Sequence, residues 1–315
     1  MAQCIHAVMK HIAIIGAGCV GSVLVERLMS SGQELTVSVI AEGKRSQRLA
    51  QSGITVNGAK IFPPNARDIH EKICVVFVCV KNYDLEQACV DMKGRIFPDT
   101  VIIPLLNSVS PTPALQDFFP DNRVLYGYIS KIDAHRENYS VSYNIAGDIH
   151  FGEAENLRPD AALEEVREIL KCAGFGAYID SDMRRGVWRK WMLNVGANQI
   201  SALTEADYLK FGEIPEIEQV LRLAMHELLI IACYEGVNLS TQDISELIEY
   251  LTTYPYPKKT SMLQDILAHR KTEVDYISGD IVRLSRKWNC PCPVNLAMYY
   301  LIKSKEACYL SENGE

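Results

Sequence analysis

The chain has 315 residues, of which 48% are hydrophobic and 23% charged, and its net charge at neutral pH is −7. This length exceeds what one hydrophobic core usually organises, so we expect two domains of ordinary globular composition. The negative charge gives no general reason to expect binding to nucleic acid or to an anionic membrane surface. No apolar run approaches the roughly 20 residues that a membrane-spanning helix requires.

The first ten residues lack the long apolar stretch and small-residue cleavage site of a secretory signal, so we expect a cytoplasmic protein. Met9-Lys10 stands directly before the first strand-like run, and residues 1–8 are expected to be a dispensable extension. Several of the ten cysteines lie in apolar runs, where reduced thiols serve as small hydrophobic groups. Cys290-Pro-Cys292 has no second pair or nearby His, which favours ordinary packing over a metal or redox pair.

The first half of the chain alternates strand-like and helical patterns. Runs rich in Val and Ile occupy residues 11–17, 35–41, 74–81 and 100–107. Because these runs are apolar on both faces, they are typical of central parallel strands covered by helices. A helix is predicted at 21–31, which makes the first strand pair a βαβ unit.

From residue 123 the pattern changes to longer strand-like stretches. Those at 124–132, 139–145 and 148–153 are predicted to be added strands, antiparallel ones included, at one side of the sheet. A helix at 159–172 and a last strand at 177–180 complete this half.

After residue 181 the strand signals nearly vanish. Helical periodicity covers residues 182–204, 215–235, 241–251, 261–287 and 294–306. A change from alternating strands and helices to continuous helices indicates a domain boundary. We therefore predict one domain at 1–180 and an all-helical substrate and catalytic domain at 181–315. The apolar helices of the second domain could pair two subunits into a homodimer.

A glycine-rich turn joins the first predicted strand to the first helix, with the sequence Gly16-Ala17-Gly18-Cys19-Val20-Gly21. In this pattern the first Gly permits the tight turn, the second lets the backbone approach a pyrophosphate, and the third lets the helix pack on the strand. The helix N-terminus then offers N–H groups to the phosphates. The alternative is a glycine turn without a ligand, but the strand–turn–helix context favours dinucleotide binding. The fold class is therefore predicted as α/β, with an N-terminal Rossmann-type doubly wound sheet.

The end of the second strand is expected to meet the adenosine ribose. Glu42 lies 21 positions beyond Gly21, where an acid would accept hydrogen bonds from both ribose hydroxyls of NAD. Lys44 and Arg45 could instead hold the 2′-phosphate of NADP. A solvated charged loop is the alternative, so these residues alone leave the choice between NADP and NAD open.

A helix in the second half carries an unusual polar side. Lys190, Asn194 and Asn198 have the i, i+4, i+8 spacing that aligns side chains along one side of a helix, among apolar neighbours. A Lys on a partly desolvated face has a lowered pKa and can donate a proton near neutral pH. A surface Lys beside ordinary packing is the alternative from the sequence alone.

A second polar group falls within the predicted helix at 261–287. Ser261 and Asp265 are expected on one helical face, with Glu273 two turns further along it. A hydroxyl and carboxylates on one face suit a small polar ligand. The alternative is an outer charged face with both carboxylates in salt bridges.

These two stretches resemble the paired signatures of the ketopantoate reductase family. They read WRK-x-x-x-N-x-x-x-N at 188–198 and SMLQD-x-x-x-x-R-x-TE-x-DYI-x-G at 261–279, and the resemblance covers nearly the whole chain. It implies that Lys190 is the proton donor and that Glu273 orients or tunes it. It also implies that Asn194, Asn198 and Ser261 hold the substrate, with Asp265 a further member of the site. Lys81 and Asn107 would lie beside the nicotinamide and its ribose.

The resemblance implies reduction of 2-dehydropantoate, a small 2-keto acid, with NADPH in pantothenate biosynthesis. Glu42 departs from the Arg usual in the family after the second strand, which leaves NAD as an alternative cofactor. The family's Asn-Gly turn after the fourth strand here reads Asn107-Ser108, and residues 250–260 are rich in Tyr and Pro. Rival interpretations are a related NAD(P)-dependent 2-keto acid reductase, a 3-hydroxyacid dehydrogenase, and a nicotinamide-binding redox regulator without turnover.

Overall fold

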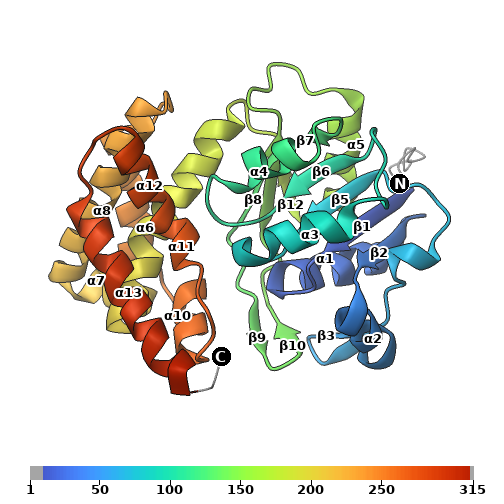
Figure 1. Ribbon diagram of the computed structural model, residues 1–315, viewed down its shortest axis with the longest axis horizontal. Coiled ribbons are helices and arrows are strands. Elements are labelled where there is room, and N and C mark those ends of the chain that lie inside the picture. The colour runs from blue at the N-terminus through green and yellow to red at the C-terminus, as the bar shows by residue number, and fades with distance from the viewer. Residues whose placement is uncertain (1–9, 313–315) are drawn as a thin grey trace. The chain divides into compact units, whose positions relative to one another are not determined.

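The computed structural model describes residues 10–312, so the predicted extension at 1–8 lies outside the described residues. The chain divides into two compact units. A sheet unit contains the chain up to Leu106 together with Pro111–Met183, and a helical unit contains Asn107–Ser110 and the chain from Arg184 onwards (Figure 1). The sequence placed the boundary at 180, and the division by contacts follows Met183 and also assigns the short segment 107–110 to the helical unit.

A parallel five-stranded sheet forms the centre of the sheet unit, as predicted. Its order is β2-β1-β5-β6-β7. The strands are β1 (His11–Ile15), β2 (Thr36–Ile40), β5 (Val75–Val78), β6 (Val101–Pro104) and β7 (Arg123–Val124). A single parallel bridge joins Val39 to Asn65 beyond the β2 edge. The chain thus moves outward from β1 to β2 and then returns to β5 on the other side of β1.

Helices cover both faces of this sheet because its strands are apolar on both sides. Along β1, Ile12 and Ile14 join the cluster that contains α1 (Cys19–Ser30). Ala13 and Ile15 join the opposite cluster, which contains residues of α3 (Leu85–Met92) and α4 (Pro111–Phe118). The remaining helical segments of this unit are α2 (Gly43–Ser52), η1 (Ala66–Asp68), η2 (Asn82–Asp84) and α5 (Ala161–Cys172).

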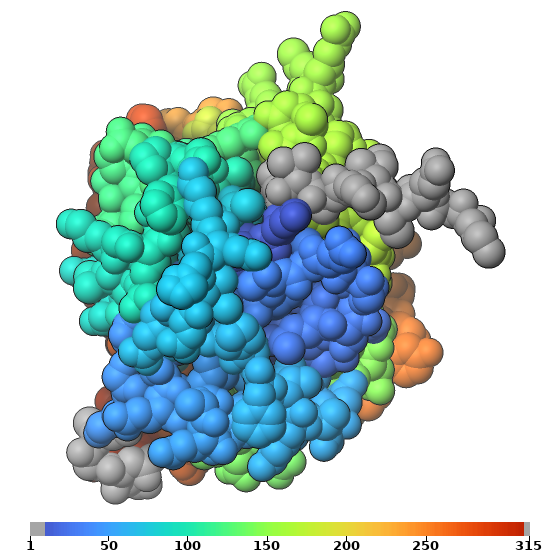
Figure 2. Space-filling model, turned by 90° about the vertical axis from the view of Figure 1, so that its right-hand side faces the viewer, coloured from blue at the N-terminus to red at the C-terminus, as the bar shows by residue number. Residues whose placement is uncertain are grey.

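The expectation that strands after residue 123 extend the main sheet is wrong except for β7. Two separate small sheets have the orders β12-β11-β8 and β4-β3-β10-β9. At Gly127 in β8, an added Cβ would lie 2.4 Å from the Pro104 carbonyl oxygen, so β8 crosses close to the end of β6 and pairs with β11 instead. The strands are β3 (Ile54–Val56), β4 (Ala59–Ile61), β8 (Tyr126–Ser130), β9 (His135–Glu137), β10 (Ser140–Ser142), β11 (Asp148–Gly152) and β12 (Gly176–Tyr178). Figure 2 shows one face of this unit, with α2 and the β3–β4 hairpin in blue along its lower edge.

The helical unit has no strand between residues 184 and 312. Its helices are α6 (Met183–Thr204), α7 (Tyr208–Glu213), α8 (Pro215–Tyr234), α9 (Thr241–Thr252), α10 (Ser261–Leu267), α11 (Val274–Ile277), α12 (Gly279–Lys287) and α13 (Pro293–Glu312). Trp191 and Val195 of α6 are buried in one core with Leu228 of α8. Within residues 10–312, no helix combines the length and apolar character needed to cross a bilayer.

The predicted single helix at 261–287 is wrong, because three helices occupy this stretch. The α10 helix ends at Leu267, and His269 adopts a left-handed backbone with φ of 50°. The Arg270 N–H donates to the Asp265 carbonyl oxygen at 2.9 Å, a bond that closes the helix end. Glu273 precedes α11, so it does not lie on a helical face shared with Ser261.

Candidate active site

In the glycine turn after β1, an added Cβ would clash at two of the three glycines and would meet no atom at the third. An added Cβ at Gly16, where φ is +97°, would lie 2.6 Å from the Val80 nitrogen. At Gly21 it would lie 1.9 Å from the Gly16 carbonyl oxygen. At Gly18 no atom lies within 4 Å of that position. Gly16 and Gly21 let the strand and the helix pack closely, and Gly18 leaves room for a ligand to approach the backbone.

The N-terminus of α1 suits an anion. Gly18 is its N-cap and has no side chain to cap the helix, and the first turn holds no acidic residue. Free N–H groups and the helix dipole at such an end favour phosphate oxygens. The turn also follows β1, the strand at which the chain reverses direction across the sheet, where α/β folds bind nucleotides. These residues therefore fit the pyrophosphate of a dinucleotide, which Gly16, Ala17, Gly18, Cys19, Val20 and Gly21 would hold.

Charged side chains gather where β2 ends. Glu42 is the N-cap residue of α2, and its carboxylate forms an ion pair with Arg95 from the segment after α3. Arg45 lies half exposed, with one guanidinium nitrogen 4.0 Å from a carboxylate oxygen of Asp91. Lys44 is exposed. The two predicted phosphate ligands are therefore accessible, and Arg95 adds a cation that the sequence analysis did not select.

Lys81 lies after β5, as expected for a side chain near the nicotinamide. It occupies the N-cap position of η2 with extended backbone and is half-buried. Its ammonium does not cap that helix. The structure thus places Lys81 at the carboxyl end of the central strand next to β1.

The polar side of α6 is as predicted from the spacing. Asn194 and Asn198 are only 5% and 4% exposed, and Lys190 is half-buried one turn earlier. Burial among apolar groups, with the nearby charge of Lys258, lowers the pKa of Lys190 to about 8. The Lys190 ammonium makes no hydrogen bond or ion pair within the described part of the chain. An amine with this pKa is protonated at neutral pH and can give up its proton readily.

Asn198 carries an unsatisfied group. Its side-chain Nδ2 is buried and has no hydrogen-bond partner among residues 10–312. Leaving a buried donor unpaired costs about 1–3 kcal/mol. A buried donor without a partner requires an explanation, and a ligand that accepts from it is one.

Asn107 connects two predicted site residues within the helical unit. Its Oδ1 accepts from Asn194 Nδ2 at 3.1 Å, and its Nδ2 donates to Glu273 Oε2 at 3.1 Å. Glu273 is 4% exposed. The three side chains come from segments far apart in the sequence, and the hydrogen bonds fix the Glu273 carboxylate relative to α6.

Ser261 and Asp265 lie in other surroundings. Ser261 is the exposed first residue of α10, and buried Thr260 is the N-cap, accepting from the Leu263 N–H at 3.1 Å. Asp265 is buried and forms an ion pair with Arg270 at 2.9 Å. The structure shows no hydrogen bond that joins either residue to Lys190.

The residue after Asn107 shows how this chain replaces a glycine. Ser108 adopts a φ of 83°, a left-handed conformation that favours glycine. Its hydroxyl donates to Asp280 Oδ2 at 2.5 Å. Burial raises the pKa of the Asp280 carboxyl. A buried hydrogen bond therefore compensates for a strained backbone at this turn.

Lys258 is a functional candidate that the sequence analysis missed. Its ammonium lies 5.4 Å from the ring centre of Tyr254 and 5.9 Å from that of Tyr208, distances typical of cation–π contacts. It is also the charge that helps to lower the pKa of Lys190. The available signal was a Lys pair within the Tyr- and Pro-rich segment at 250–260.

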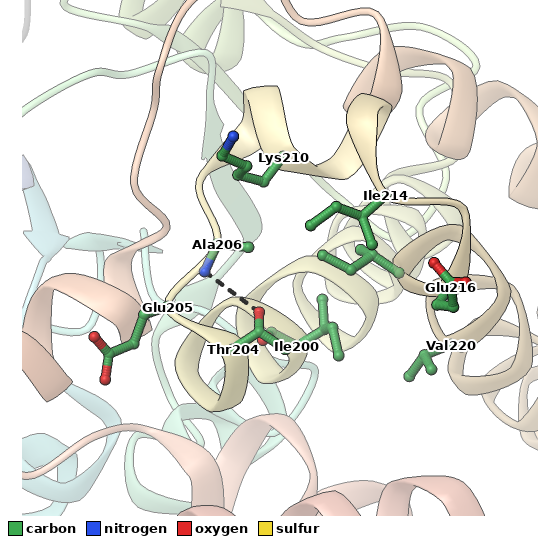
Figure 3. Close-up of a pocket in the computed structure, with 9 residues that line it drawn as sticks. Ile200, Thr204, Glu205, Ala206, Lys210, Ile214, Glu216 and Val220 are labelled. Atoms are coloured by element: carbon green, nitrogen blue, oxygen red, sulfur yellow. Dashed lines mark hydrogen bonds between the residues drawn. The ribbon is translucent and has the colours of Figure 1, made fainter.

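A pocket of about 530 Å³ lies at the other end of α6. Figure 3 shows Ile200, Ile214 and Val220 around it, with Lys210 and Glu205 also on its lining. None of the predicted site residues lines this pocket. Lys190 and the unpaired amide of Asn198 therefore lie outside this pocket.

Comparison with known families matches both halves of the chain. The family described as ketopantoate reductase PanE/ApbA matches residues 12–156, and its C-terminal counterpart matches residues 182–306. A 2-dehydropantoate 2-reductase of Archaeoglobus fulgidus is 27% identical over 304 residues, which cover 95% of this chain and 98% of the relative. The same enzyme of Halobacterium salinarum is 25% identical, over 93% of this chain and 97% of the relative.

Solved structures show the same fold. A D-mandelate dehydrogenase with NADH and anilino(oxo)acetate has a TM-score of 0.84 at 23% identity, covering 95% of this chain and 99% of that one. A PanE/ApbA family ketopantoate reductase from Ralstonia eutropha has a TM-score of 0.82 at 22% identity, covering 96% and 100%. With both halves matched, the chain belongs to the ketopantoate reductase PanE/ApbA family and is an NAD(P)-dependent oxidoreductase.

Proposed function

We propose that this chain reduces 2-dehydropantoate to pantoate, a step of pantothenate biosynthesis. The observation that carries the proposal is the Lys190 ammonium, half-buried on α6 with a pKa lowered to about 8 and without a partner within the described residues. The relatives named 2-dehydropantoate 2-reductase support the substrate.

Lys190 acts as the general acid. A bound reduced nicotinamide supplies the hydride that reduces a ketone carbon. Negative charge develops on the ketone oxygen, and Lys190 Nζ neutralises it by donating a proton, which leaves a neutral amine that solvent reprotonates. General acid catalysis of this kind contributes about 10²- to 10⁴-fold to the rate.

Glu273 orients this acid. Its buried carboxylate is held by Asn107, which also accepts from Asn194 on the helix that carries Lys190. Burial and the charge of Lys258 set the pKa of Lys190, so the role proposed for Glu273 is to orient the polar side of α6.

Asn194, Asn198 and Ser261 are proposed to hold the substrate. The unpaired Asn198 Nδ2 can donate to a carboxylate or hydroxyl oxygen of a small acid, and the exposed Ser261 hydroxyl is accessible. Asp265 is engaged by Arg270, which supports a role in holding the C-terminal end of α10, the helix that begins at Ser261.

An aromatic 2-keto acid is a second candidate substrate. Tyr208 and Tyr254 contact Lys258, the cation whose charge lowers the pKa of Lys190. The partly exposed ring of Tyr254 can pack against an aromatic side chain, and the fold is shared with a D-mandelate dehydrogenase.

The test is a panel of 2-keto acids with NADPH and NADH, followed by loss of nicotinamide absorbance. The proposal predicts turnover of 2-dehydropantoate, and turnover of phenylglyoxylate alone would favour the second candidate. Oxidation of 3-hydroxyacids without keto acid reduction would identify a 3-hydroxyacid dehydrogenase. Tight nucleotide binding without turnover of any substrate would identify a redox regulator.

We also propose a cytoplasmic homodimer. The cysteines within residues 10–312 are free thiols, as in a reducing compartment. A ketopantoate reductase from Staphylococcus aureus with a TM-score of 0.78 is described as dimeric. Light scattering of the purified protein would give twice the mass of 35.3 kDa if the proposal holds.

A further inference from the structure

The ion pair between Glu42 and Arg95 lies where β2 ends and α2 begins. Both side chains are accessible to a ligand, because the Glu42 side chain is 36% exposed and that of Arg95 is 25% exposed. The end of the second strand in this fold meets the adenosine ribose of a dinucleotide. The pair therefore stands where NADH and NADPH differ.

A carboxylate at the end of the second strand favours NADH over NADPH. It can accept hydrogen bonds from the 2′- and 3′-hydroxyls of the NADH ribose, whereas it repels the 2′-phosphate of NADPH. Arg95 holds the carboxylate by a charge-assisted hydrogen bond. The N-terminus of α2, of which Glu42 is the N-cap, further favours a negative charge at this position.

Without the Glu42 carboxylate, the surrounding arginines would favour the 2′-phosphate of NADPH. Arg95 would lose its carboxylate partner, and a guanidinium binds a phosphate through paired N–H groups. Arg45 contributes less, because Asp91 lies 4.0 Å from its guanidinium.

We infer that Glu42 makes this enzyme select NADH and that Arg95 is a latent site for a 2′-phosphate, which Glu42 occupies. This inference rests on the proposed dinucleotide site but is independent of which keto acid is reduced. It replaces the NADPH preference that the family resemblance implied.

The experiment measures dissociation constants for NADH and NADPH from nicotinamide fluorescence, without a keto acid. We expect the wild-type chain to bind NADH at least tenfold more tightly than NADPH. Glu42→Ala should strengthen NADPH binding at least tenfold, and the double variant Glu42→Ala/Arg95→Ala should lose that gain. Glu42→Gln, which keeps the side-chain shape, is the second variant if Glu42→Ala does not fold.

Arg48→Ala is the matched control, because this α2 arginine lies 4.9 Å from the Tyr139 ring and is not paired with Glu42. It should leave the ratio of the two affinities unchanged. Tighter binding of NADPH by the wild type would overturn the inference, as would a double variant that keeps the NADPH gain. If neither nucleotide binds the wild type, the proposed function fails as well, whereas a wrong affinity ratio with intact keto acid reduction defeats only this inference.

Discussion

The glycine turn after β1 and the polar side of α6 are built in different ways. The turn consists of six consecutive residues, and neighbouring backbone atoms leave no room for a Cβ at Gly16 or Gly21. The candidate site on α6 brings Lys190 near Lys258 and joins Asn194 to Asn107 and Glu273, partners that come from distant segments. A contiguous site can be recognised from local pattern, whereas a dispersed site depends on how the helices pack.

The two regions also depend on different physical effects. The turn depends on steric fit, because only Gly can be accommodated at positions 16 and 21. Charge and desolvation underlie the chemistry proposed for α6, because they set the pKa of Lys190. Substitutions should therefore act on folding and nucleotide affinity in the first region and on turnover in the second.

Replacing Lys190 should have the largest effect. Lys190→Ala removes the proton donor and is expected to lower kcat by about 10²- to 10⁴-fold. The nucleotide dissociation constant, measured by fluorescence, should stay within about twofold of wild type because the glycine turn belongs to the sheet unit. Lys190→Arg keeps the charge but donates a proton poorly, so it should be nearly as inactive. An equal loss of nucleotide affinity in Lys190→Ala would place this side chain in a structural role.

Two alanine substitutions in the turn should separate packing from binding. Gly21→Ala places a Cβ 1.9 Å from the Gly16 carbonyl oxygen, so the melting temperature should fall by several degrees and nucleotide binding by at least about 100-fold. Gly18→Ala meets no atom within 4 Å, so its melting temperature should match wild type. Its nucleotide affinity should still fall by about tenfold or more, because the new methyl group occupies the space for the pyrophosphate. Unchanged affinity in Gly18→Ala would show that the phosphates do not approach this residue.

Asn198 tests whether the unpaired amide serves a ligand. Asn198→Leu removes a buried donor without a partner, so the free energy of unfolding should not decrease. The value of kcat/KM for the keto acid should fall by about 10- to 100-fold, as expected for a lost hydrogen bond to a charged group. Denaturant unfolding and steady-state kinetics measure the two effects. A loss of stability with unchanged kcat/KM would show that the amide supports packing only.

The smallest expected effect concerns the charge of Lys258. Because Lys190 must be protonated to act, kcat/KM for reduction should be nearly constant below about pH 7 and fall as pH rises through the Lys190 pKa of about 8. Lys258→Met removes a positive charge and should raise the pKa of Lys190, so the activity at pH 9 relative to pH 7 should increase a few-fold. Lys259→Met, a change in the exposed neighbour, is the matched control and should leave the profile unchanged. A profile that Lys258→Met does not move would remove Lys258 from the site.

The sequence predicted the polar side of α6 because residues with i, i+4, i+8 spacing necessarily share one side of a helix. It did not predict that Glu273 would lie before α11, since His269 interrupts the helical pattern through a backbone conformation that only the folded chain reveals. Ser108 is a similar case, because its left-handed backbone is compensated by Asp280 from a distant helix. The Glu42–Arg95 pair was also out of reach, because nothing local relates residue 42 to residue 95.

By itself the sequence determined the parallel strands, the glycine turn, the helical second half and the alignment of Lys190 with Asn198. These features follow from periodicity and from steric limits that act over a few neighbouring residues. Only the tertiary structure decided which carboxylates and cations surround those groups, and with them the lowered pKa of Lys190 and the pairing of Glu42. Burial and the distance between charges set such properties, and both depend on contacts between segments far apart in the chain.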